Sequence, residues 1–157
     1  SQEGPRLLPA PDSVPFVAMG SPEAVVEADM IRKELQYASL EEYKELSVPE
    51  DLSYEVSKAS ELFRVNCLMC HGETMRGDGP TGIMMVEKGL SPLPTDLMLP
   101  LTQDSLAGEL FAFIGNGGRQ GYSLIERGKE STSPMPEFRL LLSESERWTL
   151  VKYLLDR

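Results

Sequence analysis

Both cysteines and the only histidine of the chain lie within one short segment, Cys67-Leu68-Met69-Cys70-His71, of a sequence of 157 residues. Thiolates and imidazole are side chains that soft and borderline metals prefer as ligands. Since the sequence contains no other Cys or His, any site built on this segment must be completed by groups of a different kind.

Two chemistries that use paired cysteines lack a required part here. A structural zinc site takes about four nitrogen or sulfur ligands, usually as two separated pairs. The sequence holds no second pair, so carboxylates would have to substitute. A thioredoxin-like dithiol has its first cysteine at the N-terminus of a helix, usually in a βαβ unit. In this sequence a helical pattern precedes Cys67, and no strand pattern flanks it.

The segment is complete for a third chemistry, the covalent attachment of haem. Two thiols three positions apart on one helical turn can reach the two vinyl groups of a protoporphyrin and form thioethers. His71, directly after the second cysteine, then lies under the iron as an axial ligand. We therefore predict a single haem c that is bound through Cys67 and Cys70 and has His71 as a ligand of its iron.

A helix must present this segment. Val56, Ala59, Phe63 and Cys67 recur at helical spacing, which predicts an amphipathic helix that delivers the cysteines at its C-terminal end. The glycines and the proline that follow, between residues 72 and 82, predict irregular chain.

The rest of the C-terminal part is also predicted to be helices and loops. A proline-rich loop is expected over residues 89–100, and a helix that begins at Thr102 and ends at Gly115 follows it, with Leu106 on its apolar face. Another loop is expected over residues 115–138, before a last helix that starts after a capping box at Ser143. Because no longer segment alternates with a period of two, the predicted fold class is all-α.

The chain is predicted to divide into an N-terminal arm, residues 1–50, and a domain, residues 51–157. Residues 1–22 hold five of the twelve prolines, which favours extended chain. Residues 22–46 have a helical pattern in two pieces, with many charges and few apolar side chains. This composition is typical of a solvated spacer or of an arm that lies along another subunit.

The charge of the chain excludes nucleic acid as a partner. The formal net charge is −10, and residues 1–60 alone carry 12 acidic and 5 basic side chains. Binding of phosphates needs lysine and arginine in excess. No apolar run approaches the roughly 20 residues of a membrane-spanning helix, so no transmembrane segment is expected in this chain.

Residues 51–157 resemble a class I cytochrome c. The resemblance is carried by the helix that runs into C-x-x-C-H, the glycine-rich segment GETMRGDGP, the segment SPMPEF and the aromatic C-terminal helix SESERWTLVKYL. It implies a fold of few helices and long loops around one haem, with the partly helical arm as an addition. It also implies that the first and last helices cross, with Phe63, Trp148 and Tyr153 as the candidates for that contact.

The second axial ligand is predicted to be a methionine, because no second histidine exists; a lysine or an open position are the alternatives. Met135 is the predicted ligand. Pro134 and Pro136 stiffen the chain on both sides of it, and the resemblance places the ligand shortly before the last helix. Some of the other methionines lie too close to His71 in the sequence, and some lie in the arm. The remaining three, Met84, Met85 and Met98, are assigned to packing.

Groups around the ligands follow from the resemblance alone. It implies that a proline after the motif, here Pro80, supplies a carbonyl to the second nitrogen of His71. Arg76, Arg119 and Tyr122 are the candidates for contact with the haem propionates, and the sequence does not choose among them.

With both axial positions filled by protein, electron transfer is expected rather than catalysis. The predicted function is that of an electron-transfer subunit of a membrane-bound respiratory or photosynthetic quinol-oxidising complex, with multihaem or other redox subunits as partners. The segment LLPAPDSVPF resembles the N-terminal part of the monohaem cytochrome subunit of the bacterial assembly called alternative complex III. The alternatives are a freely diffusing electron shuttle and a haem gas sensor or peroxidase-like protein.

The resemblance also implies a location. Covalent haem attachment in bacteria takes place outside the cytoplasm, so the chain is expected in the periplasm or on the extracytoplasmic face of the membrane. A lipid anchor on a residue before Ser1 would be compatible with that location.

Overall fold

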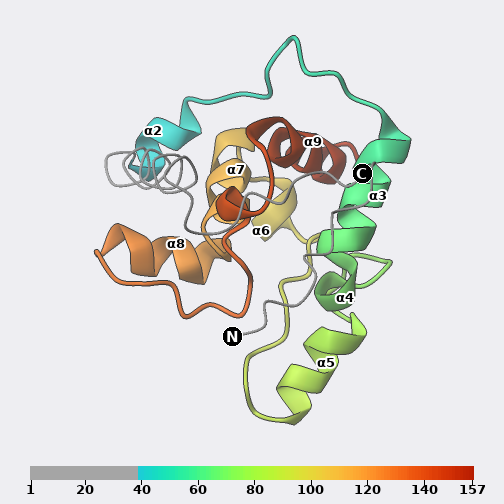
Figure 1. The fold of residues 1–157 in the computed structure, drawn as a ribbon, viewed down its shortest axis with the longest axis vertical. Helices are drawn as coiled ribbons and strands as arrows, with labels where there is room; N and C mark the ends of the chain where they lie inside the picture. The colour runs from blue at the N-terminus through green and yellow to red at the C-terminus, as the bar shows by residue number, and fades with distance from the viewer. Residues whose placement is uncertain (1–38) are drawn as a thin grey trace, which may run out of the picture.

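The computed structural model describes residues 39–157, and this part of the chain folds into helices and loops without strands (Figure 1). The all-α prediction is therefore confirmed. The predicted helical piece and the proline-rich segment that precede residue 39 lie outside the described residues. In chain order the elements are α2 (Leu40–Lys44), α3 (Val56–Asn66), α4 (Leu68–His71), α5 (Pro80–Glu87), α6 (Pro100–Gln103), α7 (Ala107–Gly115), α8 (Gly118–Glu126), the 3₁₀ turn η1 (Phe138–Leu140) and α9 (Glu144–Leu155).

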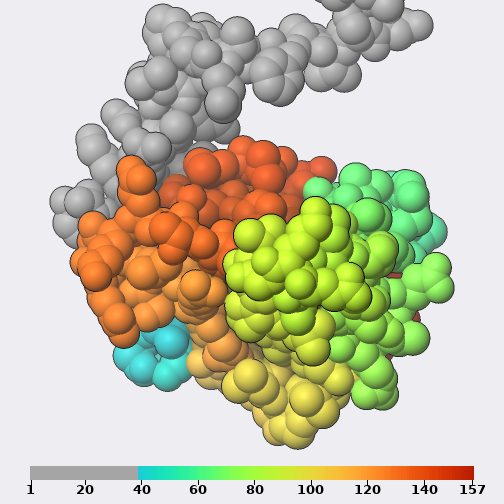
Figure 2. Space-filling model, turned by 90° about the horizontal axis from the view of Figure 1, so that it is seen from below, coloured from blue at the N-terminus to red at the C-terminus, as the bar shows by residue number. Residues whose placement is uncertain are grey.

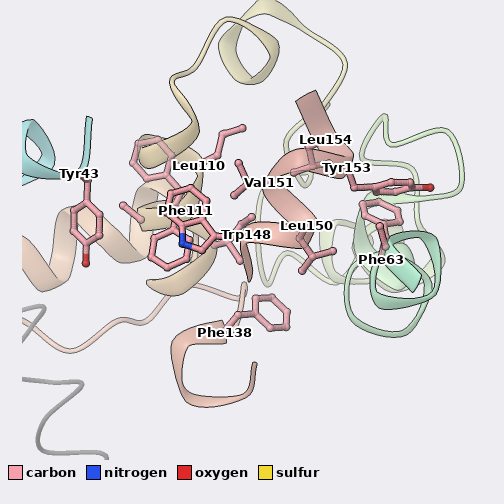
Figure 3. Packing of buried hydrophobic residues seen from close by; sticks show 14 of the residues in the cluster. Tyr43, Phe63, Leu110, Phe111, Phe138, Trp148, Leu150, Val151, Tyr153 and Leu154 are labelled. Carbon is pink, nitrogen blue, oxygen red and sulfur yellow. The ribbon is translucent and has the colours of Figure 1, made fainter. Parts of the chain in front are cut away.

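The helix before the cysteines, α3, packs against the C-terminal helix α9 (Figure 1). Ala59 of α3 and Val151 of α9 have no exposed surface. The rings of Phe63 and Tyr153 lie 5.9 Å apart with planes tilted by 50° (Figure 3). The predicted contact between the first and last helices of the domain is present, although α3 begins at Val56 rather than at residue 51.

Trp148 was expected at this contact, and that expectation is wrong. Its indole stacks on Phe111 of α7, with ring centroids 4.1 Å apart and planes 13° apart (Figure 3). Residues 110–114 of α7 are all buried, because α7 packs against α2, α8, η1 and α9. Helix α7 is therefore the centre of the domain, and α9 contacts α3 with one part of its surface and α7 with another.

Helix α2 lies against the domain although its residues fall in the predicted arm. Ser39 and Glu42 form the capping box expected from the sequence, and Glu42 N–H donates to Ser39 Oγ over 3.3 Å. Tyr43 is buried against α7. A Cβ atom at Gly108 would lie only 1.6 Å from the Tyr43 carbonyl oxygen, so the two backbones touch there. The division of the chain at residue 50 stays a prediction.

The single helix predicted from Thr102 is interrupted. Leu106 is extended (φ −67°, ψ 149°), and its N–H donates to the Glu109 carboxylate over 2.9 Å. A new helix, α7, therefore begins after Leu106, and the Leu106 side chain is 52% exposed instead of buried. A local side-chain acceptor for the first free N–H of a helix thus outweighs the continuous apolar spacing.

One further helix, α5, starts within a segment that was predicted to be irregular, and another, α8, lies wholly inside one. Helix α5 begins at Pro80, where a proline needs no N–H partner. Helix α8 begins at Gly118 and packs against α7. The contact includes Tyr122 and Phe113, whose rings meet edge to face at 5.8 Å. Within residues 39–157, no helix combines the length and the hydropathy needed to cross a membrane.

Candidate functional site

Cys67, Cys70 and His71 lie on one helical turn at the junction of α3 and α4. Cys67 ends α3, where its N–H donates to the Phe63 carbonyl over 2.8 Å, and it also precedes α4. Its own carbonyl accepts the N–H groups of Cys70 (3.2 Å) and His71 (2.9 Å). The packing of Phe63 against α9 and these backbone hydrogen bonds therefore anchor the turn that carries all three residues.

A cleft opens beside this turn. It consists of two hollows that share part of their walls, and the larger encloses about 990 Å³ between its walls, partly open to solvent. The residues common to both hollows are Cys67, His71, Thr95, Gly118, Arg119, Met135 and Phe138. In Figure 2 the segment that contains α5 (yellow-green) stands forward between the α8 region (orange) and the α3–α4 region (green). The cleft thus receives side chains from the N-terminal and the C-terminal parts of the domain.

The ring of His71 is held by a backbone carbonyl. Its Nδ1 lies 3.1 Å from the carbonyl oxygen of Thr95. Burial lowers the pKa of His71, and the hydrogen bond to Thr95 opposes part of that shift. A neutral imidazole with its proton on Nδ1 has a free lone pair on Nε2, which is the form that binds a metal.

Pro80 was expected to provide this carbonyl, and that expectation is wrong. Pro80 is the first residue of α5, whereas Thr95 lies in the proline-rich loop before α6. The loop is close because Gly77 and Gly82 have no side chains: a Cβ atom would lie 2.2 Å from the Pro94 carbonyl oxygen at Gly77 and 2.7 Å from the Pro94 ring at Gly82. The sequence signal that points to Thr95 is therefore the glycine spacing, which admits the loop.

The glycine-rich segment also folds back onto the cysteine turn. The N–H of Gly77 donates to the His71 carbonyl over 2.9 Å, and that of Gly79 donates to the Cys70 carbonyl over 3.1 Å. Met75, within this segment, is 3% exposed and has a left-handed backbone with φ 63°. Such a conformation is unfavourable for a residue with a side chain, and its carbonyl accepts the N–H of Leu97 over 2.8 Å. No pattern in the sequence indicates that Met75 has a left-handed backbone or that its carbonyl binds Leu97.

The two thiols are protonated at neutral pH. Burial raises the pKa of Cys67 to about 12, and the neighbouring Cys70 adds to the shift; burial also raises the pKa of Cys70. An activated dithiol needs a lowered thiol pKa, so this environment does not support thioredoxin-like chemistry. Among residues 39–157, no group of three or more His, Cys, Asp or Glu side chains is placed to hold a metal ion.

Met135 lies in the wall of the cleft together with His71. It is half-buried on the loop between α8 and η1, and its N–H donates to Ser133 Oγ over 3.3 Å. Of the methionines assigned to packing, Met84 is 42% exposed and Met98 packs against the core. Met85, by contrast, also lines the larger hollow.

Arg119 is the only charged side chain among the described residues that line the cleft, and no carboxylate lines it there. Its Nη2 donates to the Leu101 carbonyl over 2.6 Å and to Ser105 Oγ over 3.0 Å. Its guanidinium lies 4.4 Å from the centre of the Phe113 ring. These contacts hold a positive charge at the edge of an otherwise uncharged cavity.

The other two candidates for contact with propionates are placed elsewhere. Arg76 forms an ion pair with Asp96 at 3.6 Å and does not line either hollow. Tyr122 is 6% exposed between Phe113 and Tyr43. Burial raises the pKa of Tyr122 to about 12.

The donor set of the cleft fits a haem. Two thiols, an imidazole with a free nitrogen and a thioether sulfur border a space lined mostly by apolar side chains, among them Phe113, Phe138 and Leu150. A single arginine provides a partner for the negatively charged carboxylates of such a group. A planar apolar molecule with an iron centre and anionic edge groups has these requirements.

A protein-family model matches this chain, whereas no match was found among curated proteins or among solved structures. The family model described as cytochrome c matches residues 56–157, which include the cysteine turn, Met135 and the C-terminal helix. The chain therefore belongs to the cytochrome c family, whose members carry covalently bound haem c and serve in electron transfer.

Proposed function

We propose that the domain transfers single electrons through one haem c that is attached to Cys67 and Cys70 and ligated by His71 and Met135. The observation that carries this proposal is that one cleft brings together His71, at the end of α4, and Met135, on the loop between α8 and η1. When bound, the haem supplies the Fe(II)/Fe(III) couple.

The side chains of the cleft adjust this couple. The Thr95 carbonyl orients His71 and increases its electron donation. A thioether is a weak, neutral donor that favours ferrous iron, so ligation by Met135 raises the reduction potential. With His71 and Met135 both bound to the iron, no coordination site would be open to a substrate. This arrangement favours electron transfer over catalysis.

Arg119 is the group that best suits a haem carboxylate. It lines both hollows, and three contacts, with Leu101, Ser105 and Phe113, fix its position before any ligand binds. Its Nη2 hydrogens are taken by Leu101 and Ser105, so Nε and Nη1 remain to donate to a carboxylate. Because the described lining of the cleft has no other charge, Arg119 would be the charged partner of a haem carboxylate there.

For the physiological setting, we propose a subunit of a membrane-bound redox complex on the extracytoplasmic side. The support is the acidic, proline-rich N-terminal sequence and its resemblance to the cytochrome subunit of alternative complex III. Co-purification with multihaem and membrane subunits in mild detergent is the expected result. A monodisperse monomer that needs no detergent would instead identify a diffusing shuttle.

Met135→Ala tests the ligand assignment. The ferric wild-type protein should show the far-red sulfur-to-iron charge-transfer band, and the variant should lose it and bind carbon monoxide when reduced. Met85→Ala is the matched control, because Met85 is the other methionine of the cleft wall. If the band survives in Met135→Ala and disappears in Met85→Ala, Met135 is the wrong methionine. Prompt binding of carbon monoxide by the reduced wild type would indicate a gas-sensing protein.

A further inference from the structure

Two consecutive glycines lie against the loop that carries Met135. Gly117 and Gly118 both have left-handed backbones, with φ of 80° and 75°. Residues with side chains adopt this conformation at a cost of about 1–2 kcal/mol each. Two left-handed positions in a row therefore strongly favour glycine at both. The pair joins the buried end of α7 to the start of α8.

Each glycine faces a different part of Met135. A Cβ atom at Gly117 would lie 2.8 Å from the Met135 carbonyl oxygen and 3.2 Å from Ser131 Oγ. A Cβ atom at Gly118 would lie 3.1 Å from the Met135 sulfur and 4.0 Å from its Cβ. Among the described residues, Met135 is the only one within 4 Å of that position, once the chain neighbours and the nearby backbone of α8 itself are set aside.

The backbone of the Met135 loop is fixed separately. Ser131 Oγ accepts the N–H of Ser133 over 3.3 Å, and Ser133 Oγ accepts the N–H of Met135 over 3.3 Å. These bonds place the main chain of Met135, and its partly buried side chain packs against the hydrophobic core. Gly118 is a position at which an added methyl group would meet the sulfur, and both residues line the cleft.

We infer that Gly118 is a positioning residue for the axial sulfur. Because it has no side chain, the Met135 thioether can lie against the start of α8 and from there reach into the cleft. A methyl group at position 118 would occupy that place and would displace the sulfur from the cleft wall that it shares with His71. This inference rests on the proposed ligation by Met135.

The structure provides a matched control for backbone strain. Gly128, at the C-terminal end of the same helix, has φ 71°, and no atom lies within 4 Å of the place where its Cβ would be. Gly118→Ala and Gly128→Ala therefore carry the same left-handed penalty. Only the first of them introduces a methyl group next to the Met135 sulfur.

The experiment compares the holoproteins of wild type, Gly118→Ala, Gly128→Ala and Met135→Ala. Gly118→Ala should weaken the far-red charge-transfer band, lower the reduction potential and increase the affinity of the reduced protein for carbon monoxide by about tenfold or more. Gly128→Ala should match the wild type in all three readouts, while both glycine variants lose thermal stability. If Gly118→Ala cannot be matured, Gly118→Asn replaces it, because asparagine tolerates the left-handed backbone better than alanine.

Two outcomes would overturn the inference. If Met135→Ala loses the band while Gly118→Ala and Gly118→Asn keep the wild-type band, potential and inertness to carbon monoxide, Gly118 has only a structural role. If Met135→Ala itself keeps the band, the ligation by Met135 is wrong, and the inference fails together with it.

Discussion

The Nδ1 atom of His71 lies 3.1 Å from the carbonyl oxygen of Thr95, a residue on a loop that reaches the cysteine turn only because Gly77 and Gly82 have no side chains. The hydrogen bond fixes the imidazole plane and its tautomer. A backbone acceptor cannot be removed by changing its own side chain, so its contribution has to be tested through the glycines that admit the loop.

Gly77→Ala should displace this loop and weaken the bond to His71. The added methyl group would lie 2.2 Å from the Pro94 carbonyl oxygen. An imidazole with a weaker hydrogen bond donates less electron density to ferric iron, so the reduction potential should rise. The expected rise is tens of millivolts; for one electron, ~59 mV corresponds to a tenfold change in the equilibrium constant.

Gly89→Ala is the control for that experiment, because Gly89 has φ 68° and no atom lies within 4 Å of the place that an added Cβ would take. It should lose about 1 kcal/mol of stability through backbone strain and keep the wild-type potential. Equal potentials for both variants in a redox titration would show that the Thr95 carbonyl does not affect the iron.

Arg119→Gln should lower the reduction potential. The arginine is the one charge among the described cleft-lining residues, and its removal leaves a haem carboxylate uncompensated, which favours ferric iron. Arg127→Gln makes the same change of charge at the C-terminal cap of α8, away from the cleft.

The two arginine variants should also differ in the resonance Raman spectrum. The propionate bending mode should shift in Arg119→Gln and not in Arg127→Gln, because only Arg119 is placed to donate hydrogen bonds to a carboxylate. Identical spectra and identical potentials in the two variants would argue against this role.

Trp148→Ala should strongly destabilise the domain. The indole is 3% exposed and stacks on Phe111 at 4.1 Å, so the substitution removes a large part of the contact between α7 and α9. The expected loss is about 3–5 kcal/mol in the free energy of unfolding, measured by denaturant titration of the holoprotein. Leu141→Ala, at a position that is 64% exposed, should stay near wild type.

Tyr122 should make stability depend on pH in the alkaline range. Burial raises its pKa from 10.0 to about 12 in the folded protein. The unfolded chain therefore releases this proton first, and the stability that Tyr122 contributes is present below pH 10 and is lost between pH 10 and about 12.

Tyr122→Phe should remove that part of the pH dependence. Denaturant titrations of wild type and variant at several pH values should give free-energy curves that converge or cross as the pH rises from 10 to 12. Parallel curves across this range would show that the phenol titrates alike in the folded and unfolded states.

The predictable parts of the fold are those with local signals. The spacing of Ala59 and Phe63 indicates α3, and the capping boxes at Ser39 and Ser143 mark the starts of α2 and α9. The C-x-x-C-H segment likewise identifies the haem turn without any knowledge of its surroundings, because all three residues share one turn.

The parts that could not be predicted depend on tertiary contacts. Helix α8 begins with Gly118, a poor helix residue whose choice is explained by the Met135 sulfur beside it. The Thr95 carbonyl reaches His71 from a distant loop. Trp148 was predicted to contact α3, because no pattern in the sequence indicates that Phe111 is its partner. In each case the deciding neighbour is far away in the chain.

The most direct test of the account is the intact mass of the natively matured protein, measured under denaturing conditions together with that of the double variant Cys67→Ala/Cys70→Ala. The account predicts that the wild-type mass exceeds that of the polypeptide by one haem that survives denaturation, and that the double variant has no such excess. A colourless wild-type chain with the bare polypeptide mass and two thiols that react with an alkylating reagent would contradict it.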